Sequence, residues 1–103
     1  MNNNPKKAQF FSFSAYLERA LQLAEYHKDE NGVVVAQVPN FPVFFSQGEN
    51  FEEARENLKD AIEGNLVLAL QFGFDIPRIE GVEMKEVDHE ISPRLYPIPL
   101  PPR

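Results

Sequence analysis

One stretch near the middle of the chain constrains its fold more than any other, because it predicts a single long amphipathic helix over residues 51–72. Asn50 can cap this helix, and Glu53 three positions later completes a capping box. Gly73 is the residue type that most often follows the last turn of a helix. At 100° per residue the apolar side chains fall on one stripe, made of Phe51, Ala54, Leu58, Ala61, Ile62, Ala69 and Phe72, with Leu66 and Leu68 on its borders. Such a helix has to pack its apolar stripe on another element.

The residues before the helix predict the sheet on which it packs. Asn31-Gly32 is a strong hairpin signal, so a strand is expected on each side of it. Together with the β-branched and aromatic content, this predicts strands at residues 21–28, 33–38 and 43–47. Residues 14–20 fit either a short helix or an extended lead-in to the first strand.

The fold predicted from these elements is of the α+β class, with the order β-β-β-α-β. Weak alternation after the helix predicts a last, edge-type strand at residues 82–87 of the same mainly antiparallel sheet. The domain is expected to cover residues 14–90, after a disordered or partly ordered tail at residues 1–13. Five of the nine prolines lie in the last eleven residues, so residues 91–103 are expected to form a proline-rich tail.

Composition excludes several classes of function. The chain has 103 residues, enough for one core, and no cysteine, which rules out disulfides, a thiolate nucleophile and cysteine-ligated metal. A net charge of −6 argues against binding nucleic acid through its phosphates, and suits either solubility or a basic partner. The polar start does not resemble a signal peptide and no apolar run is long enough for a membrane span, so a cytoplasmic protein is expected.

The chain resembles the HicB family of antitoxins over about residues 16–80. The resemblance is carried by AEYHKDENGVVVAQVPNFPVFFSQGENFEEA (residues 24–54), ENLKDAIE (56–63) and DIP (75–77). It implies a fold similar to a truncated ribonuclease-H-like sheet. It also implies a non-catalytic role, which is to bind and silence a small, basic, HicA-like toxin that cleaves mRNA. Val43 stands where the family usually has glycine, and the proline-rich end leaves no room for the C-terminal module that lets many HicB proteins bind DNA. The chain therefore looks like the short, solitary type, and no direct DNA binding is expected.

Two surfaces are candidates for contact with a toxin. One is the exposed side and edge of the sheet, represented by Tyr26, Phe44 and Gln47. The other is the acidic side of the helix, represented by Glu52, Glu56 and Asp60, which a basic partner could meet. An ordinary solvated helix face explains the same acids, and an orphan structural or regulatory module without a toxin explains the same fold.

Further apolar residues predict contact between copies of the chain. Val67 and Leu70 project on the side of the helix away from Leu58 and Ile62, where a pair of apolar residues favours burial by another chain or by the proline-rich tail. We expect a homo-oligomer, with a contact made of Val67, Leu70, Leu95, Tyr96 and Ile98.

The remaining polar residues give weaker signals. Asn65 on the apolar stripe is expected to be a hydrogen-bonded structural residue, and Gly64 to mark close packing. Glu25, His27 and Asp29 would line one face of a strand and could in principle bind a divalent metal, which keeps open a metal-dependent ribonuclease as a minor alternative. No catalytic residue, metal ligand or cofactor is predicted.

Overall fold

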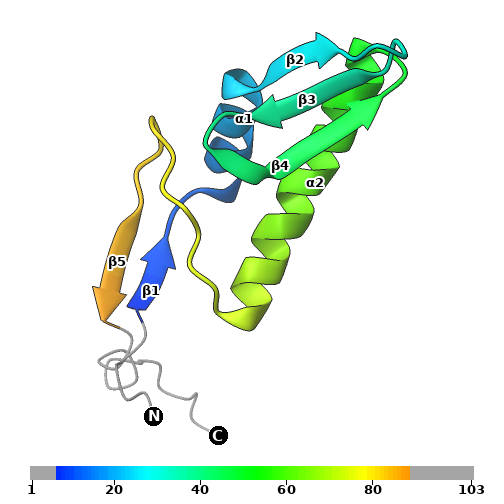
Figure 1. Cartoon of the computed structure of the whole chain (residues 1–103). Helices are drawn as coiled ribbons and strands as arrows, with labels where there is room; N and C mark the ends of the chain where they lie inside the picture. Colours follow the sequence, from blue (N-terminus) through cyan, green and yellow to red (C-terminus); the bar gives the residue numbers. More distant parts are fainter. Residues whose placement is uncertain (1–6, 89–103) are drawn as a thin grey trace, which may run out of the picture.

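The computed structural model describes residues 7–88, and the chain is coloured along its length in Figure 1. Two helices and five strands occur within these residues. In chain order they are β1 (Lys7–Phe10), α1 (Phe13–Leu23), β2 (Glu25–Lys28), β3 (Val34–Val38), β4 (Phe41–Gly48), α2 (Phe51–Phe72) and β5 (Lys85–Asp88).

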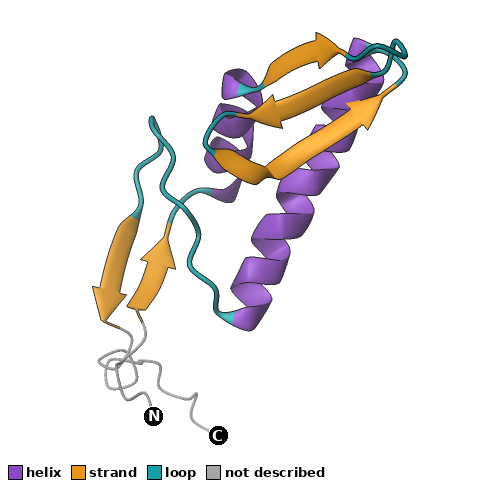
Figure 2. Ribbon diagram, in the orientation of Figure 1, coloured by secondary structure: helices purple, strands orange, loops and turns teal. Residues whose placement is uncertain are grey.

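The centre of the molecule is an antiparallel sheet of three strands in the order β2-β3-β4. Both helices lie on the same side of this sheet, and α2 runs the length of it (Figure 2). The α+β class, the antiparallel sheet and the long helix on one face are all as predicted from the sequence.

The last strand is not part of this sheet, and that part of the prediction is wrong. β5 pairs antiparallel with β1 in a separate two-stranded ribbon, with Lys7 opposite Asp88 and Phe10 opposite Lys85. β1 arises from residues expected in the N-terminal tail, where no alternation of apolar side chains marks a strand. β5 pairs with β1 and therefore does not pair with an edge strand of the main sheet.

The segment before the hairpin is helical for longer than expected. Residues 21–23, predicted as strand, are the last turn of α1, and β2 begins only at Glu25. Ser12 caps α1, since its hydroxyl oxygen accepts from the backbone N–H of Ala15 at 3.1 Å. In the hairpin the four residues of β2, Glu25–Lys28, pair with β3, so the residues before them are free to stay helical. The helical propensity of the leucine- and alanine-rich segment therefore prevails before Ala24.

The turn between β2 and β3 is built on Asp29 and Gly32. One carboxylate oxygen of Asp29 accepts from the backbone N–H groups of Asn31 (2.8 Å) and Val33 (2.9 Å). Gly32 has φ +83, a left-handed conformation that glycine adopts without strain. Asn31 does not share the positive φ, so the loop is a tight turn followed by a left-handed glycine, not the two-residue loop that Asn-Gly most often makes.

Helix α2 begins and ends where the sequence predicts. Asn50 Oδ1 accepts from the backbone N–H of Glu53 at 2.7 Å, while the Glu53 carboxylate accepts from the N–H of Glu49 at 2.6 Å. At the other end Gly73 is left-handed with φ 75. The buried residues of α2 are Ala54, Leu58, Ile62 and Leu66. Both ends of the predicted stripe are in contrast exposed: Phe51 meets only Tyr26 at the edge of the sheet, and Phe72 lies beyond the last buried residue of the helix, Leu66.

Strand β4 and helix α2 are held together by side chains that donate to the backbone. The buried hydroxyl of Ser46 donates to the carbonyl oxygen of Ala54 at 2.7 Å, and the amide of Asn57 donates to that of Gln47 at 2.8 Å. The half-buried amide of Asn65 donates to the carbonyl oxygen of Ala61 at 2.8 Å, so its prediction as a hydrogen-bonded structural residue is confirmed. The contacts of Ser46 and Asn57 fix the orientation of α2 on the sheet.

Gly48 permits the close approach of β4 to the first turn of α2. A Cβ at this position would lie 2.5 Å from the backbone nitrogen of Ala54, which cannot move aside without shifting the helix. A glycine is therefore required where β4 passes the start of α2.

Candidate functional site

The three-stranded sheet has one open face, opposite the helices. The strand register places two rows of side chains across it: Glu25, Gln37 and Phe45 in one, and His27, Val35 and Gln47 in the other. Of these six, only Val35 is partly covered, and Phe45 is 47% exposed. Gln47 thus lies on the open face of the sheet, as expected.

Phe44 does not lie on this face, and its expected place on the exposed side of the sheet is wrong. It is 1% exposed, its ring is stacked on that of Phe41 at 5.4 Å, and its edge meets Tyr16 at 6.3 Å. Residues three apart in a strand point to opposite faces, so Phe44 and Gln47 could not share one. The exposed phenylalanine of this strand is Phe45, which alternation along β4 could have identified.

Tyr26 lies at the edge of the sheet and faces α2. It stands opposite Ala36 in the register, on the side covered by the helix, and its ring centre is 6.0 Å from that of Phe51. The side chain is half-buried, so only part of it is accessible to a partner.

The three acidic residues predicted to meet a basic partner form a strip along the outside of α2. Glu52, Glu56 and Asp60 are all exposed and follow one another at intervals of four residues, about 6 Å along the helix axis. We call these three residues the acidic strip. It points away from the sheet, so it lies on the opposite side of the molecule from Gln47 and Phe45. The exposed residues among those predicted to bind a partner therefore lie on two separate faces, with Gln47 on one and the acidic strip on the other.

The second half of α2 carries a different surface. Val67 and Leu70, predicted to contact another copy, are exposed, as are three further large apolar side chains. The exposed fractions are 45% for Val67, 51% for Leu68, 53% for Leu70, 64% for Phe72 and 64% for Phe74, and we call these five residues the apolar end of α2. Leu95, Tyr96 and Ile98, predicted for the same contact, lie outside the described residues.

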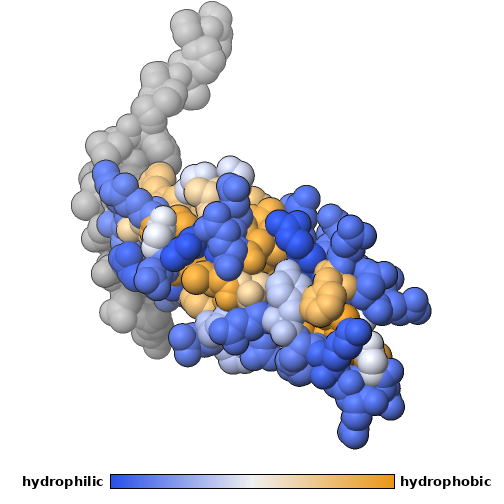
Figure 3. All heavy atoms as spheres, turned by 90° about the horizontal axis from the view of Figure 1, so that it is seen from above, coloured by the Kyte–Doolittle hydropathy of each residue, from blue (hydrophilic) through white to orange (hydrophobic). Residues whose placement is uncertain are grey.

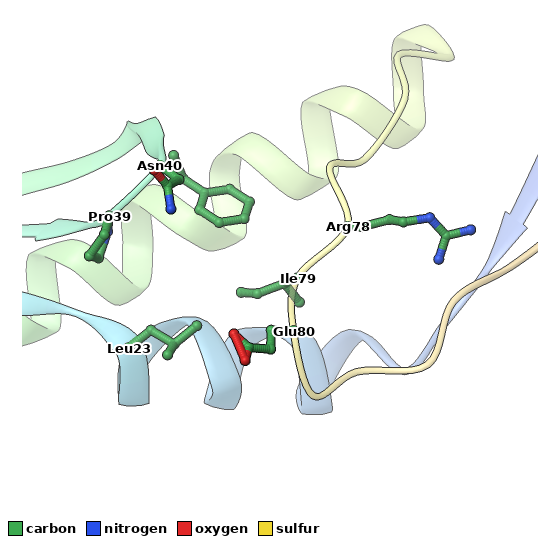
Figure 4. A pocket seen from close by; sticks show the side chains of 7 residues that line it. Leu23, Pro39, Asn40, Arg78, Ile79 and Glu80 are labelled. Carbon is green, nitrogen blue, oxygen red and sulfur yellow. The ribbon is translucent and has the colours of Figure 1, made fainter.

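Another apolar area lies beside α1 and the segment that follows α2. Seen from above, hydrophobic residues gather in the centre and hydrophilic residues surround them (Figure 3). A shallow hollow of ≈ 330 Å³ lies between α1, the turn from β3 to β4, and the segment after α2, lined by Leu23, Pro39, Asn40, Phe41, Arg78, Ile79 and Glu80. The guanidinium group of Arg78 extends away from the hollow in Figure 4 and donates to the carbonyl oxygen of Met84 at 3.4 Å. Of the described residues that line the hollow, Asn40 and Glu80 are the polar ones besides Arg78, and a ligand site usually needs several polar groups that converge.

The residues considered for a metal site do not converge on one ion. Glu25 and His27 are on the open face of the sheet, but the Asp29 carboxylate already accepts two backbone N–H groups in the turn. Within residues 7–88 no group of three or more histidine or acidic side chains is placed to hold a metal ion. Asp29 is therefore a residue of the hairpin turn.

Among the residues whose burial the structure describes, Tyr16 has the most completely buried polar side chain, and the sequence did not single it out. It is 0% exposed, and its hydroxyl donates to the carbonyl oxygen of Pro77 at 2.7 Å. Burial raises the pKa of Tyr16 from its ordinary value of 10.0 to about 12. This contact anchors the chain that leaves α2 to helix α1, and its role is structural.

A three-stranded antiparallel sheet with one helix-covered face and one open face defines a small α+β domain. The chain belongs to the UPF0150-like family, a HicB-related family whose model matches residues 15–77. No curated protein matches the chain. Among the described residues, neither helix is long and apolar enough to cross a membrane.

Solved structures similar to this chain include a protein from Thermus thermophilus and a domain of an antitoxin from Burkholderia pseudomallei. The protein TTHA0281 from Thermus thermophilus is 26% identical, with a TM-score of 0.61 over 66% of this chain and 85% of that one. The N-terminal domain of the Burkholderia pseudomallei antitoxin HicB is 24% identical, with a TM-score of 0.49 over 63% of this chain and 92% of that one.

Proposed function

We propose that this protein is an antitoxin-type binding protein, which acts in the cytoplasm without catalysis. Its partner is a small, basic, HicA-like toxin that cleaves mRNA, and the protein neutralises it by covering its active surface. The observation that carries the proposal is the family match over residues 15–77, which includes the whole three-stranded sheet and α2. The chain also offers an acidic surface of the kind that a basic protein would bind.

The acidic strip is the part of the surface best suited to such a partner. A toxin that binds mRNA needs positive charge where it holds the phosphates, and that charge would be attracted by three carboxylates in line. The strip is held in place because α2 is fixed on β4 by the hydrogen bonds of Ser46 and Asn57. A preformed, rigid surface loses little conformational entropy when it binds.

The proposal is tested by co-expression with the product of a small basic open reading frame next to the gene. The binding constant of the purified pair is measured by calorimetry at low and at high salt. Charge reversal of the strip, by Glu52→Lys, Glu56→Lys and Asp60→Lys together, is expected to weaken binding by about a hundredfold at low salt, and by less when salt screens the charges.

A control variant separates local contact from net charge. Glu18→Lys, Glu83→Lys and Glu86→Lys together change the net charge by the same amount at three exposed positions away from both α2 and the open face of the sheet. If both triple variants lose the same affinity, the strip is not the contact. Loss of binding in Phe45→Ser, with binding kept in the strip variant, would assign the contact to the open face of the sheet. If no basic partner binds at all, the protein is an orphan module of this fold.

A further inference from the structure

The hollow beside α1 is lined by apolar side chains from three separate segments of the chain. Leu23 comes from the last turn of α1, Pro39 and Phe41 from the place where β3 turns into β4, and Ile79 from the segment after α2. Ile79 is almost fully buried, and the other three are partly covered. Figure 4 shows Leu23, Pro39 and Ile79 around the same space. The ≈ 330 Å³ of the hollow therefore favours an apolar occupant.

The polar groups of the hollow suit an occupant that brings few backbone N–H groups. Besides Asn40 and Glu80 there is Arg78, whose guanidinium group extends away. A peptide of ordinary composition brings one N–H per residue, and each one that is buried without a partner costs about 1–3 kcal/mol. Proline has no N–H, and proline-rich segments in the polyproline conformation bind to apolar and aromatic grooves. The hollow therefore matches a proline-rich segment better than other peptides.

The chain itself carries a segment of this kind at residues 93–103. Five of these residues are prolines, and the large apolar or aromatic ones are Leu95, Tyr96, Ile98 and Leu100. The remaining two are Arg94 and Arg103, whose charge is opposite to that of Glu80 at the hollow. Apolar side chains gain by leaving water, and proline has less conformational freedom to lose than other residues. The segment thus complements the hollow in apolar character and in charge.

The segment is long enough to reach the hollow from the end of β5. Arg78 lines the hollow and donates to the carbonyl oxygen of Met84, the residue before β5, so the start of this strand is one side chain away. From there β5 runs four residues to Asp88 (Figure 1), which is about 13 Å. The return along β5 to the hollow takes about 25 Å, or roughly eight residues in the polyproline conformation. It therefore brings Tyr96 and the residues after it to the hollow.

We propose that the hollow is the docking site of the proline-rich segment 93–103 of the same chain. Only residues 89–92 separate this segment from β5. Its effective concentration at the hollow is therefore of the order of millimolar, and a weak contact is enough to hold it there. A separate peptide or a second copy of the chain has no such advantage. Docking covers Leu23 and Phe41 and joins the end of the chain to α1.

The first test is cross-linking within the full chain, which has no cysteine of its own. Ile98→Cys is combined with Asn40→Cys at the hollow, and the rate of disulfide formation on mild oxidation is measured at low protein concentration. The rate should be about tenfold higher than for two control pairs, in which Ile98→Cys is combined with Gln47→Cys or with Leu70→Cys. Gln47 lies on the open face of the sheet and Leu70 on the apolar end of α2, and both are exposed, as Asn40 is.

A further variant separates docking from the mere proximity of a tethered segment. Tyr96→Ser and Leu100→Ser are added to the pair of Ile98→Cys and Asn40→Cys. They leave the length of the segment unchanged and remove two of its apolar contacts. The rate should then fall to that of the control pairs.

The second test uses the chain without cysteines and follows its backbone amide signals by NMR. Tyr96→Ser with Leu100→Ser should shift the signals of Leu23 and Glu80, which line the hollow, relative to the unaltered chain. The signal of Gln47, on the open face of the sheet, should stay where it is and serves as the control.

Equal rates for the three cysteine pairs, or unchanged signals from the hollow, would overturn the proposal. A faster reaction with Leu70→Cys would also overturn it, since the segment would then cover the apolar end of α2. A disulfide that joins two chains at the same low concentration would assign the segment to a second copy, with the same result. None of these measurements involves a toxin, so failure of the proposed antitoxin function would leave them intact.

Discussion

The two halves of α2 share one continuous backbone and differ in nearly everything else. Seven of the thirteen residues from 51 to 63 are charged, and none of the eleven from 64 to 74 is. The first half is fixed to the sheet by the side chains of Ser46 and Asn57 and presents the acidic strip to solvent. The second half extends beyond the sheet with large apolar side chains exposed.

This difference shows that the burial of a helix residue depends on the reach of the neighbouring element as well as on its position around the helix. Phe72 falls on the same stripe as Leu58, yet one is 64% exposed and the other 0%. Periodicity identifies the side of a helix that packs, but not how far along the helix the packing continues. Each half can therefore be disturbed separately.

The two halves of α2 should differ most in how much stability is lost when a side chain is truncated to alanine. Leu58→Ala removes a fully buried side chain between α2 and the sheet and is expected to lower the free energy of unfolding by about 2–5 kcal/mol. Leu70→Ala in the exposed half should cost less than about 0.5 kcal/mol, measured by urea denaturation at a concentration where the chain is monomeric. Equal losses would show that the apolar end is covered within its own chain.

Glycine replacement gives the next largest effect. Gly48→Ala places a Cβ 2.5 Å from the backbone of α2 and should cost about 1–3 kcal/mol of stability. A Cβ at position 64 meets nothing within 4 Å among residues 7–88, so the close packing expected of Gly64 is not found there and Gly64→Ala should stabilise the monomer by up to about 1 kcal/mol. Thermal unfolding of dilute samples compares the two. A destabilised Gly64→Ala monomer would mean that this part of the helix is packed after all.

The smallest expected effect is that of alkaline pH on the free energy of unfolding. It should act through the covered core, because residues 64–74 include no side chain that titrates in this range. The pKa of Tyr16 is raised to about 12 in the folded chain, so the folded state keeps a proton that the unfolded state loses. Its contribution to stability is complete below pH 10 and is lost as the pH rises from 10 to 12. Tyr16→Phe should lower the free energy of unfolding by about 1 kcal/mol at neutral pH, because the hydrogen bond to the Pro77 carbonyl oxygen is lost. The variant's free energy of unfolding should also depend less on pH between 10 and 12. An unchanged profile in the variant would assign the alkaline loss to other groups.

The main sheet and α2 could be predicted from the sequence because each is encoded by nearby residues. Asn50 and Gly73 mark the ends of α2, and Asn31-Gly32 marks the hairpin. The ribbon of β1 and β5 could not be predicted, since its strands are short and lie near opposite ends of the chain. No local pattern specifies that pairing.

The candidate site was predictable in part. The acidic strip and the exposure of Val67 and Leu70 follow from the helical wheel alone. The assignment of Phe44 to the open face failed because β4 has two adjacent phenylalanines and the alternation that sets Phe45, not Phe44, on the same face as Gln47 was not applied. Tyr16 was missed because its partner is a backbone carbonyl 61 residues away, which carries no sequence signal.

The terminal ribbon is joined to the rest of the molecule by the side chain of Gln9. Its amide donates to the carbonyl oxygen of Ile76 at 3.0 Å and accepts from the N–H of Ile76 at 2.8 Å, so it pairs as a strand residue would. A ribbon of two short strands has little stability of its own. The loss of this one amide should therefore release both ends of the domain together, at a denaturant concentration where the central sheet is still intact, and hydrogen exchange would show the domain opening in two stages.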